Sequence, residues 1–458
     1  MVEHNSTELE AVSSETVISS LKVLGQILGI TLDFSANPAI SAVKVDSRLI
    51  QPGDLFVALP SDTNGRFNAT AKGSSDGHDF VSSAIEQGAC AAVVRHDYSG
   101  TVNVPLIRVT DTYDALWSMG RAAAQRFGGE KIAITGSSGK TTAKNFLQAA
   151  TGGYAAPGSY NNHIGVPLSL AMIPSRASMA ILEIGTNHPG EIGPLADMVA
   201  PSAAILLNVG TAHIENFSSK EELIVEKTSI FNNLQDKSNS ISAFDLMLNY
   251  GVNFGLDRAA DVNVLALKND SAQLSVFGQQ KIARVPGGGI HRAETLCAVI
   301  ACLHVLGKDI EGALNLSESA IPKGRGNLRT IGSSHIVDDS YNANPDSMAK
   351  TITTFLTRSE PRKLLVIGEM LELGTVSQKA HEAVGALLGG QDAICVGDAL
   401  QETAHRYKLP WFAEADDRLL DAVSARITAD CAVLVKGSNR VFWQNNFVDR
   451  LAAKLNTS

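Results

Sequence analysis

The sequence lacks any apolar run long enough to span a bilayer, and its first residues, MVEHNSTELEAVSSE, lack the basic-then-apolar order of a secretory signal. It also lacks an excess of basic residues, because 38 Lys and Arg stand against 47 Asp and Glu, a formal net charge of −9. Broad nucleic-acid or anionic-membrane surfaces are held by clustered Lys and Arg. We therefore expect a cytoplasmic protein with no nucleic-acid partner and no membrane insertion.

Cysteine is scarce: the five cysteines are odd in number, widely spaced and mostly set in apolar runs such as DAICVGD. This usage favours reduced core thiols over a disulfide framework. No internal repeat is detectable. With 458 residues, 44% of them hydrophobic and 19% charged, the chain has enough apolar material for two or three domains.

Three regions differ in their pattern of apolar, helical and turn-forming segments, which predicts an α/β protein of three domains. Residues 1–110 hold short segments such as GDLFVALP and CAAVVRH between Gly, Pro, Asn and Asp, which favours a small mixed α/β domain. Residues 111–316 alternate helical patterns with the apolar runs KIAITG, MAILEIG and AAILLNVG, typical of a parallel sheet buried on both faces. The alternation restarts in residues 317–458 with HIVDDS, KLLVIGEM, DAICVGD and AVLVKGS, which predicts a C-terminal Rossmann-like domain.

The stretch TGSSGKTT at 135–142 lies between an apolar strand and the helix-compatible run TTAKNFLQAA, the context of a phosphate-binding loop. The usual loop begins with a glycine where this chain has Ile134. Backbone N–H groups of residues 136–140 and the positive end of the following helix could still hold phosphate oxygens, with Lys140 adding charge and Thr141 a metal-binding hydroxyl. A simple Gly/Ser helix cap would not require Lys-Thr-Thr directly after its last glycine.

Polar residues follow the next two apolar runs. Glu183 ends MAILE, where a carboxylate can hold magnesium directly or through water, and His213 follows AAILLNVG. Taken singly, Glu183 fits a solvated strand end and His213 a loop histidine equally well. Lys227, in the helical run KEELIVEKTSIF, is by itself typical of a surface lysine.

The stretch DDSYNANPDSM at 338–348 predicts a polar turn after a strand. Asparagines before Pro345 favour the turn itself. The adjacent carboxylates of Asp338 and Asp339 cost energy unless they are solvated or bound to something. A functional role for this turn is therefore plausible from the residues alone.

A GTPase switch is disfavoured. The sequence has no N-K-x-D base-recognition string, and its D-x-x-G string, DTNG at 62–65, precedes the phosphate loop when it should follow it.

From about residue 40 to 440, the sequence resembles the Mur ligase family. The matching strings occur in the family's order and are VDSR, GDLFVALP, SDGHDF, TGSSGKTT, NNHIGVPLSL, LEIGTNHPGEI, LNVGTAHIENF, GRG, DDSYNANPDSM, GEMLELG with AHEAVG, and VLVKGS. The short loop T-G-x-x-G-K-T is that family's own form, which accounts for Ile134. Within the family, DDSYNANPDSM resembles the branch that adds a dipeptide.

The resemblance implies an ATP-dependent amide ligase that adds D-alanyl-D-alanine to UDP-N-acetylmuramoyl-tripeptide during cytoplasmic synthesis of peptidoglycan precursors. ATP would convert the terminal carboxylate to an acyl phosphate, which the dipeptide amine attacks with release of ADP and phosphate. The implied cofactors are ATP and Mg²⁺, the implied partners are the small-molecule substrates, and the implied state is a monomer. A related ligase acting on another acid, such as folylpoly-γ-glutamate extension or another muramoyl step, and a nucleotide-gated binding module without turnover stay open as alternatives.

The resemblance also assigns roles around ATP. Lys140, Lys227 and His213 match the catalytic set. Thr141, Glu183 and His213 match magnesium-site residues, and Lys227 matches a lysine that is carbamylated in these ligases and then helps to hold a second magnesium ion. The ATP-binding residues implied are Gly136, Ser137, Ser138, Gly139, Lys140, Thr141, Thr142, Thr295, Arg325 and Asp339.

Substrate-binding roles follow in the same way. The first domain resembles the UDP-binding segments, the middle domain contributes a loop that faces the muramoyl peptide, and the third domain contributes residues near the phosphates or acceptor. These residues are Asp46, Ser47, Arg48, Asp76, Gly77, His78, Asn161, Asn162, Tyr341 and Asn344.

Three departures from the family pattern bear on nucleotide affinity or selectivity. Thr295 stands where the family has Asn, Ser138 replaces a common Asn in the phosphate loop, and Gly, Asn and Ser thicken the loop at 61–75.

Overall fold

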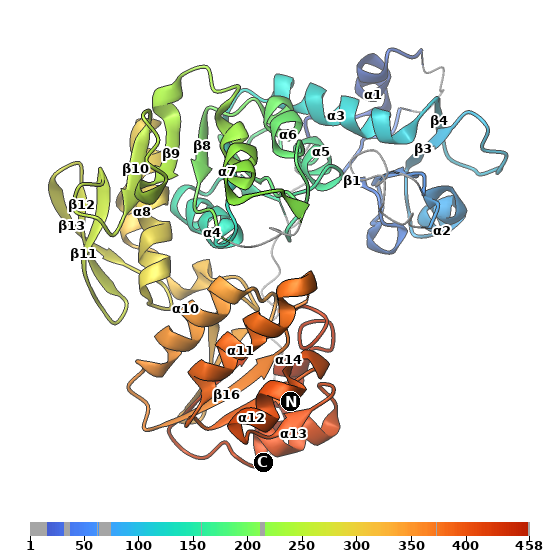
Figure 1. Ribbon diagram of the computed structural model, residues 1–458. Coiled ribbons are helices and arrows are strands. Elements are labelled where there is room, and N and C mark those ends of the chain that lie inside the picture. The colour runs from blue at the N-terminus through green and yellow to red at the C-terminus, as the bar shows by residue number, and fades with distance from the viewer. Residues whose placement is uncertain are drawn as a thin grey trace, which may run out of the picture. The chain divides into compact units, whose positions relative to one another are not determined.

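The structure is a computed structural model that describes residues 16–31, 37–61, 63, 75–156, 158–210, 216–371 and 373–456 (Figure 1). Three β-sheets organise these residues, with four, nine and six strands. No helix within the described ranges is long and apolar enough to cross a membrane. The five cysteines are free thiols, and all except Cys90 are buried.

The four-stranded sheet is parallel throughout and has the strand order β1-β2-β3-β4. Its strands are β1 (Val43–Lys44), β2 (Leu55–Val57), β3 (Ala91–Arg95) and β4 (Leu106–Val109). The helices α1 (Leu21–Leu28), α2 (Val81–Glu86) and α3 (Thr112–Arg126) accompany it. Because side chains alternate along a strand, Leu55 and Val57 join a core with α1 and α3, whereas Phe56 joins one with α2. Both faces are therefore covered.

The nine-stranded sheet has the order β13-β12-β11-β10-β9-β8-β5-β7-β6. Its strands are β5 (Glu130–Thr135), β6 (Tyr154–Ala155), β7 (Met179–Glu183), β8 (Ala203–Leu206), β9 (Ser240–Ala243), β10 (Val252–Gly255), β11 (Val262–Lys268), β12 (Ser271–Val276) and β13 (Gln279–Arg284). The helices of this part are α4 (Lys140–Thr151), α5 (Gly165–Ala171), α6 (Ile192–Val199), α7 (Lys220–Thr228), α8 (Ile290–Val305) and α9 (Glu311–Leu314). The predicted strands KIAIT, MAILE and AAIL are confirmed as β5, β7 and β8.

An antiparallel extension of this sheet was not predicted. Strands β11, β12 and β13 pair antiparallel in sequence order. Two-residue loops join them, and Phe277 and Gly278 in the second loop have φ of +48° and +80°. Positive φ at both central residues is typical of tight hairpins. Short polar and Gly-containing breaks in the sequence were the signal for these turns.

The six-stranded C-terminal sheet has the order β14-β15-β19-β16-β17-β18. Its strands are β14 (Asn327–Ile331), β15 (Ser334–Asp339), β16 (Arg362–Gly368), β17 (Ala393–Val396), β18 (Trp411–Phe412) and β19 (Cys431–Lys436). The helices are α10 (Pro345–Leu356), α11 (Ser377–Leu388), α12 (Gln401–Tyr407), α13 (Asp417–Ser424) and α14 (Phe447–Asn456). Only the β14–β15 pair among these strands is antiparallel, so the predicted parallel Rossmann-like sheet is confirmed.

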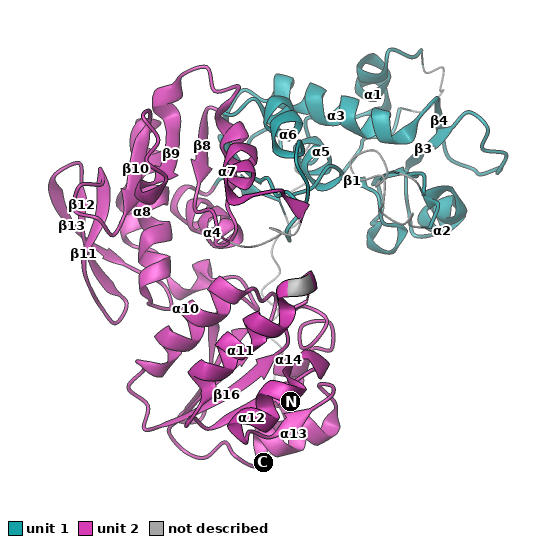
Figure 2. Cartoon of the chain, viewed as in Figure 1, with its two compact units in different colours: residues 1–133, 153–201 teal, residues 134–152, 202–458 magenta. Residues whose placement is uncertain are grey.

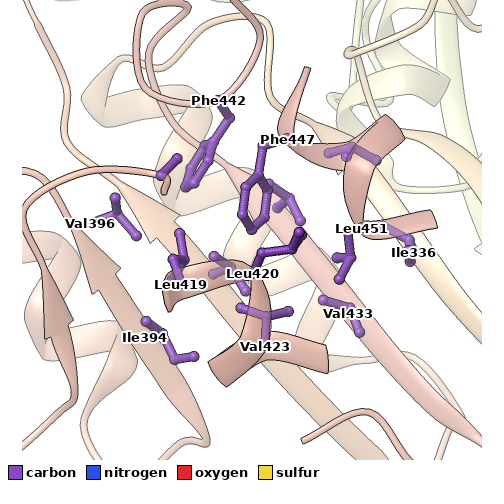
Figure 3. Packing of buried hydrophobic residues seen from close by; sticks show 14 of the residues in the cluster. Ile336, Ile394, Val396, Leu419, Leu420, Val423, Val433, Phe442, Phe447 and Leu451 are labelled. Atoms are coloured by element: carbon purple, nitrogen blue, oxygen red, sulfur yellow. The ribbon is translucent and has the colours of Figure 1, made fainter. Parts of the chain in front are cut away.

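Helices cover both faces of the C-terminal sheet. Leu364 and Val366 of β16 point into a core with α13 and α14, which Figure 3 shows from close by. Leu365 and Ile367 of the same strand point into a second core with α10, α11 and α12. Alternation along one strand thus supplies two hydrophobic cores, the pattern of a doubly wound sheet.

The chain divides into two compact units (Figure 2). One comprises residues 1–133 and 153–201, and the other residues 134–152 and 202–458. The predicted domain boundaries after residues 110 and 316 stay predictions.

Candidate active site

The phosphate-binding loop connects β5 to α4, as the sequence predicted. Its glycines have positive φ, +152° at Gly136 and +85° at Gly139, a region that glycine enters at little cost. The first turn of α4 holds Lys140, Thr141 and Thr142. Lys140 Nζ donates to the Gly136 carbonyl oxygen at 2.5 Å, so the ammonium group lies against the loop. A positive helix end beside a lysine is suited to binding phosphate.

Asn208, just after β8, fixes the shape of this loop. Its carbonyl oxygen accepts from the Ser137 N–H at 3.1 Å, and its Oδ1 accepts from the Ser138 N–H at 3.0 Å. Its Nδ2 donates to the Ser138 carbonyl at 3.1 Å. Two of the N–H groups that the sequence assigned to phosphate binding therefore bond to Asn208 in this structure, which leaves the α4 end of the loop as the better phosphate contact.

Lys227 is not a surface lysine. It lies on α7, is 2% exposed, and shares a buried face with Leu223 four residues earlier. The pKa of Lys227 is lowered to about 7: burial is the main cause, the positive charge of Lys140 adds to it, and Glu226 acts in the opposite direction. The surface position that is typical of a lysine taken by itself is therefore wrong for Lys227, and the structure places a largely desolvated amine within electrostatic reach of the phosphate-loop lysine.

Glu183 is the last residue of β7 and is only 3% exposed. The Gly185 N–H donates to the Asn161 carbonyl oxygen at 2.7 Å, and a Cβ on Gly185 would lie 3.1 Å from Asn161 Oδ1. The structure thus brings Asn161 to the strand end that carries Glu183. Asn162 Oδ1 accepts from the Gly165 N–H at 2.8 Å and holds the start of α5. His213 lies outside the described residues.

The two predicted UDP-binding segments lie at one edge of the four-stranded sheet. Asp46 follows β1 and its carboxylate accepts from Arg48, with Arg48 Nη2 2.7 Å from Asp46 Oδ2. This bond from the Arg48 side chain is the main cause that lowers the pKa of Asp46. Ser47 is buried. Gly77 donates to the Leu59 carbonyl, just after β2, at 2.7 Å. Because β1 and β2 are parallel neighbours, both segments lie at the carboxyl ends of the strands, on the same side of the sheet.

His78 is held in one tautomer at this edge. Its Nδ1 lies 2.6 Å from Asp76 Oδ1, and its Nε2 accepts from the Arg95 N–H at the end of β3 at 3.0 Å. A ring nitrogen that accepts from an N–H carries no proton, so Nδ1 is the donor to Asp76. The carboxyl ends of three parallel strands therefore converge on Asp76, His78 and their neighbours.

In the C-terminal sheet, Asp339 is paired with a buried lysine that sequence reasoning missed. Lys436 Nζ lies 2.7 Å from Asp339 Oδ2, and the side chain of Lys436 is 2% exposed. Thr351 Oγ1 donates to the same carboxylate oxygen at 3.0 Å. The string VLVKGS carried the signal, because a lysine at the end of an entirely apolar strand has to find a partner.

The adjacent carboxylates of Asp338 and Asp339 bind different partners, which offsets the repulsion between them. Asp338 is buried, which raises its pKa, and its Oδ1 accepts from Ser340 while Arg329 approaches its Oδ2 at 3.4 Å. Asp339 points instead to Lys436. The two charges therefore have different environments on opposite sides of β15.

Arg325 and Tyr341 form one stacked group. The guanidinium carbon of Arg325 lies 4.2 Å from the centroid of the Tyr341 ring. Trp443 meets the same ring edge-on at 5.3 Å. Asn344 caps α10, because its Oδ1 accepts from the Ser347 N–H at 2.8 Å, so this side chain has a structural use independent of any ligand.

Thr295 lies on α8, where its hydroxyl donates to the His291 carbonyl at 2.9 Å. A Cβ on Gly139 would lie 3.6 Å from Thr295 Oγ1. The structure thus brings Thr295 next to the phosphate loop, although its hydroxyl is used within the helix.

Comparisons with known proteins agree with this arrangement. Residues 134–302 match the Mur ligase middle domain, and residues 324–439 match the Mur ligase, glutamate ligase domain. The UDP-N-acetylmuramoyl-tripeptide–D-alanyl-D-alanine ligase of Rickettsia prowazekii is 31% identical over 80% of this chain and 83% of its own length.

Solved structures agree as well. MurF from Acinetobacter baumannii has a TM-score of 0.77 at 26% identity, covering 93% of this chain and 97% of that one. MurF ligase from Thermotoga maritima in complex with ADP has a TM-score of 0.74 at 26% identity, covering 91% and 98%. The α/β architecture with a small N-terminal sheet, a phosphate-loop sheet and a C-terminal sheet is therefore shared with these structures. The chain belongs to the Mur ligase family, among relatives named UDP-N-acetylmuramoyl-tripeptide–D-alanyl-D-alanine ligase.

Proposed function

We propose that the chain is an ATP-dependent amide ligase that joins D-alanyl-D-alanine to UDP-N-acetylmuramoyl-tripeptide through an acyl phosphate, with release of ADP and phosphate. Family membership, the names of the relatives and the ADP complex of one structural neighbour support this function. The single observation in the molecule that carries it is the burial of Lys227 close enough to the phosphate-loop Lys140 for the two charges to interact.

A buried lysine in this position is suited to carbamylation. Its low pKa leaves much of the amine neutral near pH 7. The neutral nitrogen attacks carbon dioxide, a C–N bond forms and one proton is released, which leaves a carbamate anion. That product replaces a buried cation that lies near another cation by an anion, so Lys140 stabilises the modified form.

The chemistry of the proposed ligands supports magnesium. Thr141, Glu183, His213 and carbamylated Lys227 would hold it, and three of these four groups offer the oxygen ligands that Mg²⁺ prefers. When bound, the ion neutralises charge on the transferring phosphoryl group.

The chain's own groups do the remaining work of positioning. Lys140 and the N-terminal end of α4 hold phosphate oxygens. Arg325 and Asp339 contact the nucleotide from the C-terminal sheet, with Thr295 beside the loop. Orientation and electrostatic stabilisation account for most of the rate gain in phosphoryl and acyl transfer of this kind.

The other substrates have their own surfaces. The edge that carries Asp46, Ser47, Arg48 and residues 76–78 binds UDP. Asn161 and Asn162 face the muramoyl peptide, and Tyr341 and Asn344 lie near the phosphates or the acceptor. We propose that the enzyme acts in the cytoplasm, which its acidic composition and free thiols support. The proposal keeps a monomer with domains 1–110, 111–316 and 317–458.

Phosphate release from the purified chain tests the proposal. With Mg-ATP, release is expected only when UDP-N-acetylmuramoyl-tripeptide and D-alanyl-D-alanine are both present. Turnover with a single amino acid in place of the dipeptide would assign the chain to another branch of the family. Nucleotide binding without any acceptor-dependent turnover would indicate a binding module.

A further inference from the structure

Arg292, in the first turn of α8, hydrogen-bonds to the backbone of two separate loops. The residue is only 9% exposed. Its Nη1 donates to the carbonyl oxygens of Gly287 at 2.9 Å and Gly288 at 3.3 Å. Its Nη2 donates to the carbonyl oxygens of Arg325 at 3.2 Å and Gly326 at 3.3 Å. One guanidinium therefore joins the loop before α8 to the segment before β14.

Both loops leave room for this guanidinium by having glycine. A Cβ on Gly287 would lie 2.4 Å from Arg292 Nη1, and a Cβ on Gly326 would lie 1.9 Å from Nη2. The two glycines also have φ of +67° and +86°, where other residues are strained. The close fit is thus a property of the loops as well as of the arginine.

Two carboxylates offset part of the cost of burying the Arg292 cation. Burial opposes the cation and lowers the pKa of Arg292, while the carboxylates of Asp339 and Glu318 act in the opposite direction. Glu318 also accepts from the Gly287 N–H at 3.0 Å, on the same loop whose carbonyl Arg292 holds. Arg292 therefore interacts electrostatically with Asp339 and hydrogen-bonds to both loops.

The segment that Arg292 holds carries Arg325. The Arg325 side chain stacks on Tyr341, and the Tyr341 N–H donates to the Gly324 carbonyl at 2.9 Å. The backbone position of residues 324–326 consequently sets where the Arg325 guanidinium can reach. The planar Arg292 guanidinium donates to four carbonyl oxygens in a fixed geometry. It therefore holds the backbone of residues 324–326 more firmly than a lysine ammonium group could.

We propose that Arg292 is a positioning residue for nucleotide binding, which acts by holding the Arg325 backbone so that the Arg325 side chain meets the nucleotide. The proposal rests on the proposed function, in which Arg325 contacts ATP.

The affinity of the full chain for ADP, measured by calorimetry, tests this role without turnover. Arg292→Met should weaken ADP binding about tenfold to a hundredfold, the range that misplacement of a positioning group produces. Arg292→Lys should be intermediate, because lysine keeps the charge and loses the fork. Arg358→Met is the control, since Arg358 is a partly buried arginine whose side chain is paired with Glu360, and the ADP affinity of this variant should be unchanged.

A double variant separates positioning from general destabilisation. If Arg292 acts through Arg325, adding Arg292→Met to Arg325→Ala should cost little further ADP affinity. Additive losses, or an unchanged ADP affinity in Arg292→Met, would overturn the proposal. If Arg292→Met does not fold, the same cycle with Arg292→Lys decides the question. A parent that binds ADP but releases no phosphate with both substrates would refute the proposed function alone.

Discussion

Lys436 and Asp339 face each other across two parallel strands of the C-terminal sheet, where they are direct register partners on β19 and β15. Their charged atoms are 2.7 Å apart. Burial alone would raise the pKa of Asp339, but the charges of Lys436 and Arg292 and the bonds from Lys436 and Thr351 hold that pKa below its usual value. The carboxylate therefore stays ionised and fixed at the strand end where a ligand would bind.

Lys436→Met should lower the free energy of unfolding by about 3 kcal/mol, because removing one partner of a buried ion pair leaves the other charge without compensation. It should also weaken ADP binding, since Asp339 loses its anchor. Urea denaturation and calorimetry measure the two effects. Arg418→Met, which removes an exposed pair with Asp416, is the control and should leave the free energy of unfolding nearly unchanged, because solvent screens an exposed pair. Equal effects of the two substitutions would contradict a special role for the buried pair.

The lowered pKa of Lys227 predicts a pH-dependent cost to stability. In the unfolded chain this amine has its usual pKa of 10.5, and in the folded chain about 7. As pH falls from 10.5 to about 7 the unfolded chain gains a proton that the folded chain does not, so stability falls over this window and then levels off. At about 1.4 kcal/mol per pH unit, the upper bound is on the order of 5 kcal/mol.

Denaturation of the parent and of Lys227→Met in carbon-dioxide-free buffer measures this cost. The variant should gain stability relative to the parent as pH is lowered from about 10.5 to about 7. Lys379→Met, which removes an exposed lysine, is the control for loss of a lysine as such. A flat difference for Lys227→Met would mean that its amine is not desolvated in solution.

Carbamylation of Lys227 predicts chemical rescue. Lys227→Ala removes the nitrogen on which the carbamate forms and should lose most of the ligase activity. Added short carboxylic acids can enter the vacated space and supply a carboxylate in place of the carbamate, so they should restore part of kcat. Full activity in Lys227→Ala without any added acid would refute the carbamate hypothesis.

Gly77 is the position where a single methyl group should disturb the predicted UDP-binding edge. A Cβ there would lie 2.7 Å from the Leu59 backbone nitrogen, which cannot yield as a side chain does. Gly77→Ala should displace Asp76 and His78 and raise the KM for the UDP-linked substrate about tenfold, with the KM for ATP unchanged.

Steady-state kinetics with each substrate varied in turn checks this prediction. Gly128→Ala is the control, because no heavy atom lies within 4 Å of its added Cβ. A rise in both KM values for Gly77→Ala would point to general misfolding.

The sequence predicted the parallel strands and the phosphate loop well, because both depend on local patterns. Buried parallel strands are continuous apolar runs, as in KIAIT and AVLVK, and the loop is defined by residues adjacent in the chain. The β11–β13 extension was missed because its signal is short alternation interrupted by two-residue turns, which is weaker than an apolar run. The proposed roles of the site residues stay predictions.

What the sequence by itself determined is therefore the α/β class, the buried parallel strands with the phosphate loop, and the family. Only the tertiary structure decided the surroundings of individual side chains: Lys227 is buried where the charge of Lys140 lowers its pKa, Lys436 neutralises Asp339 from 97 residues away, and Arg292 binds carbonyls on both sides of α8 and α9. Periodicity predicts which face of an element is apolar. It does not predict which charged group from a distant element contacts a buried ion. Such contacts set the pKa values and the side-chain positions on which the chemistry depends.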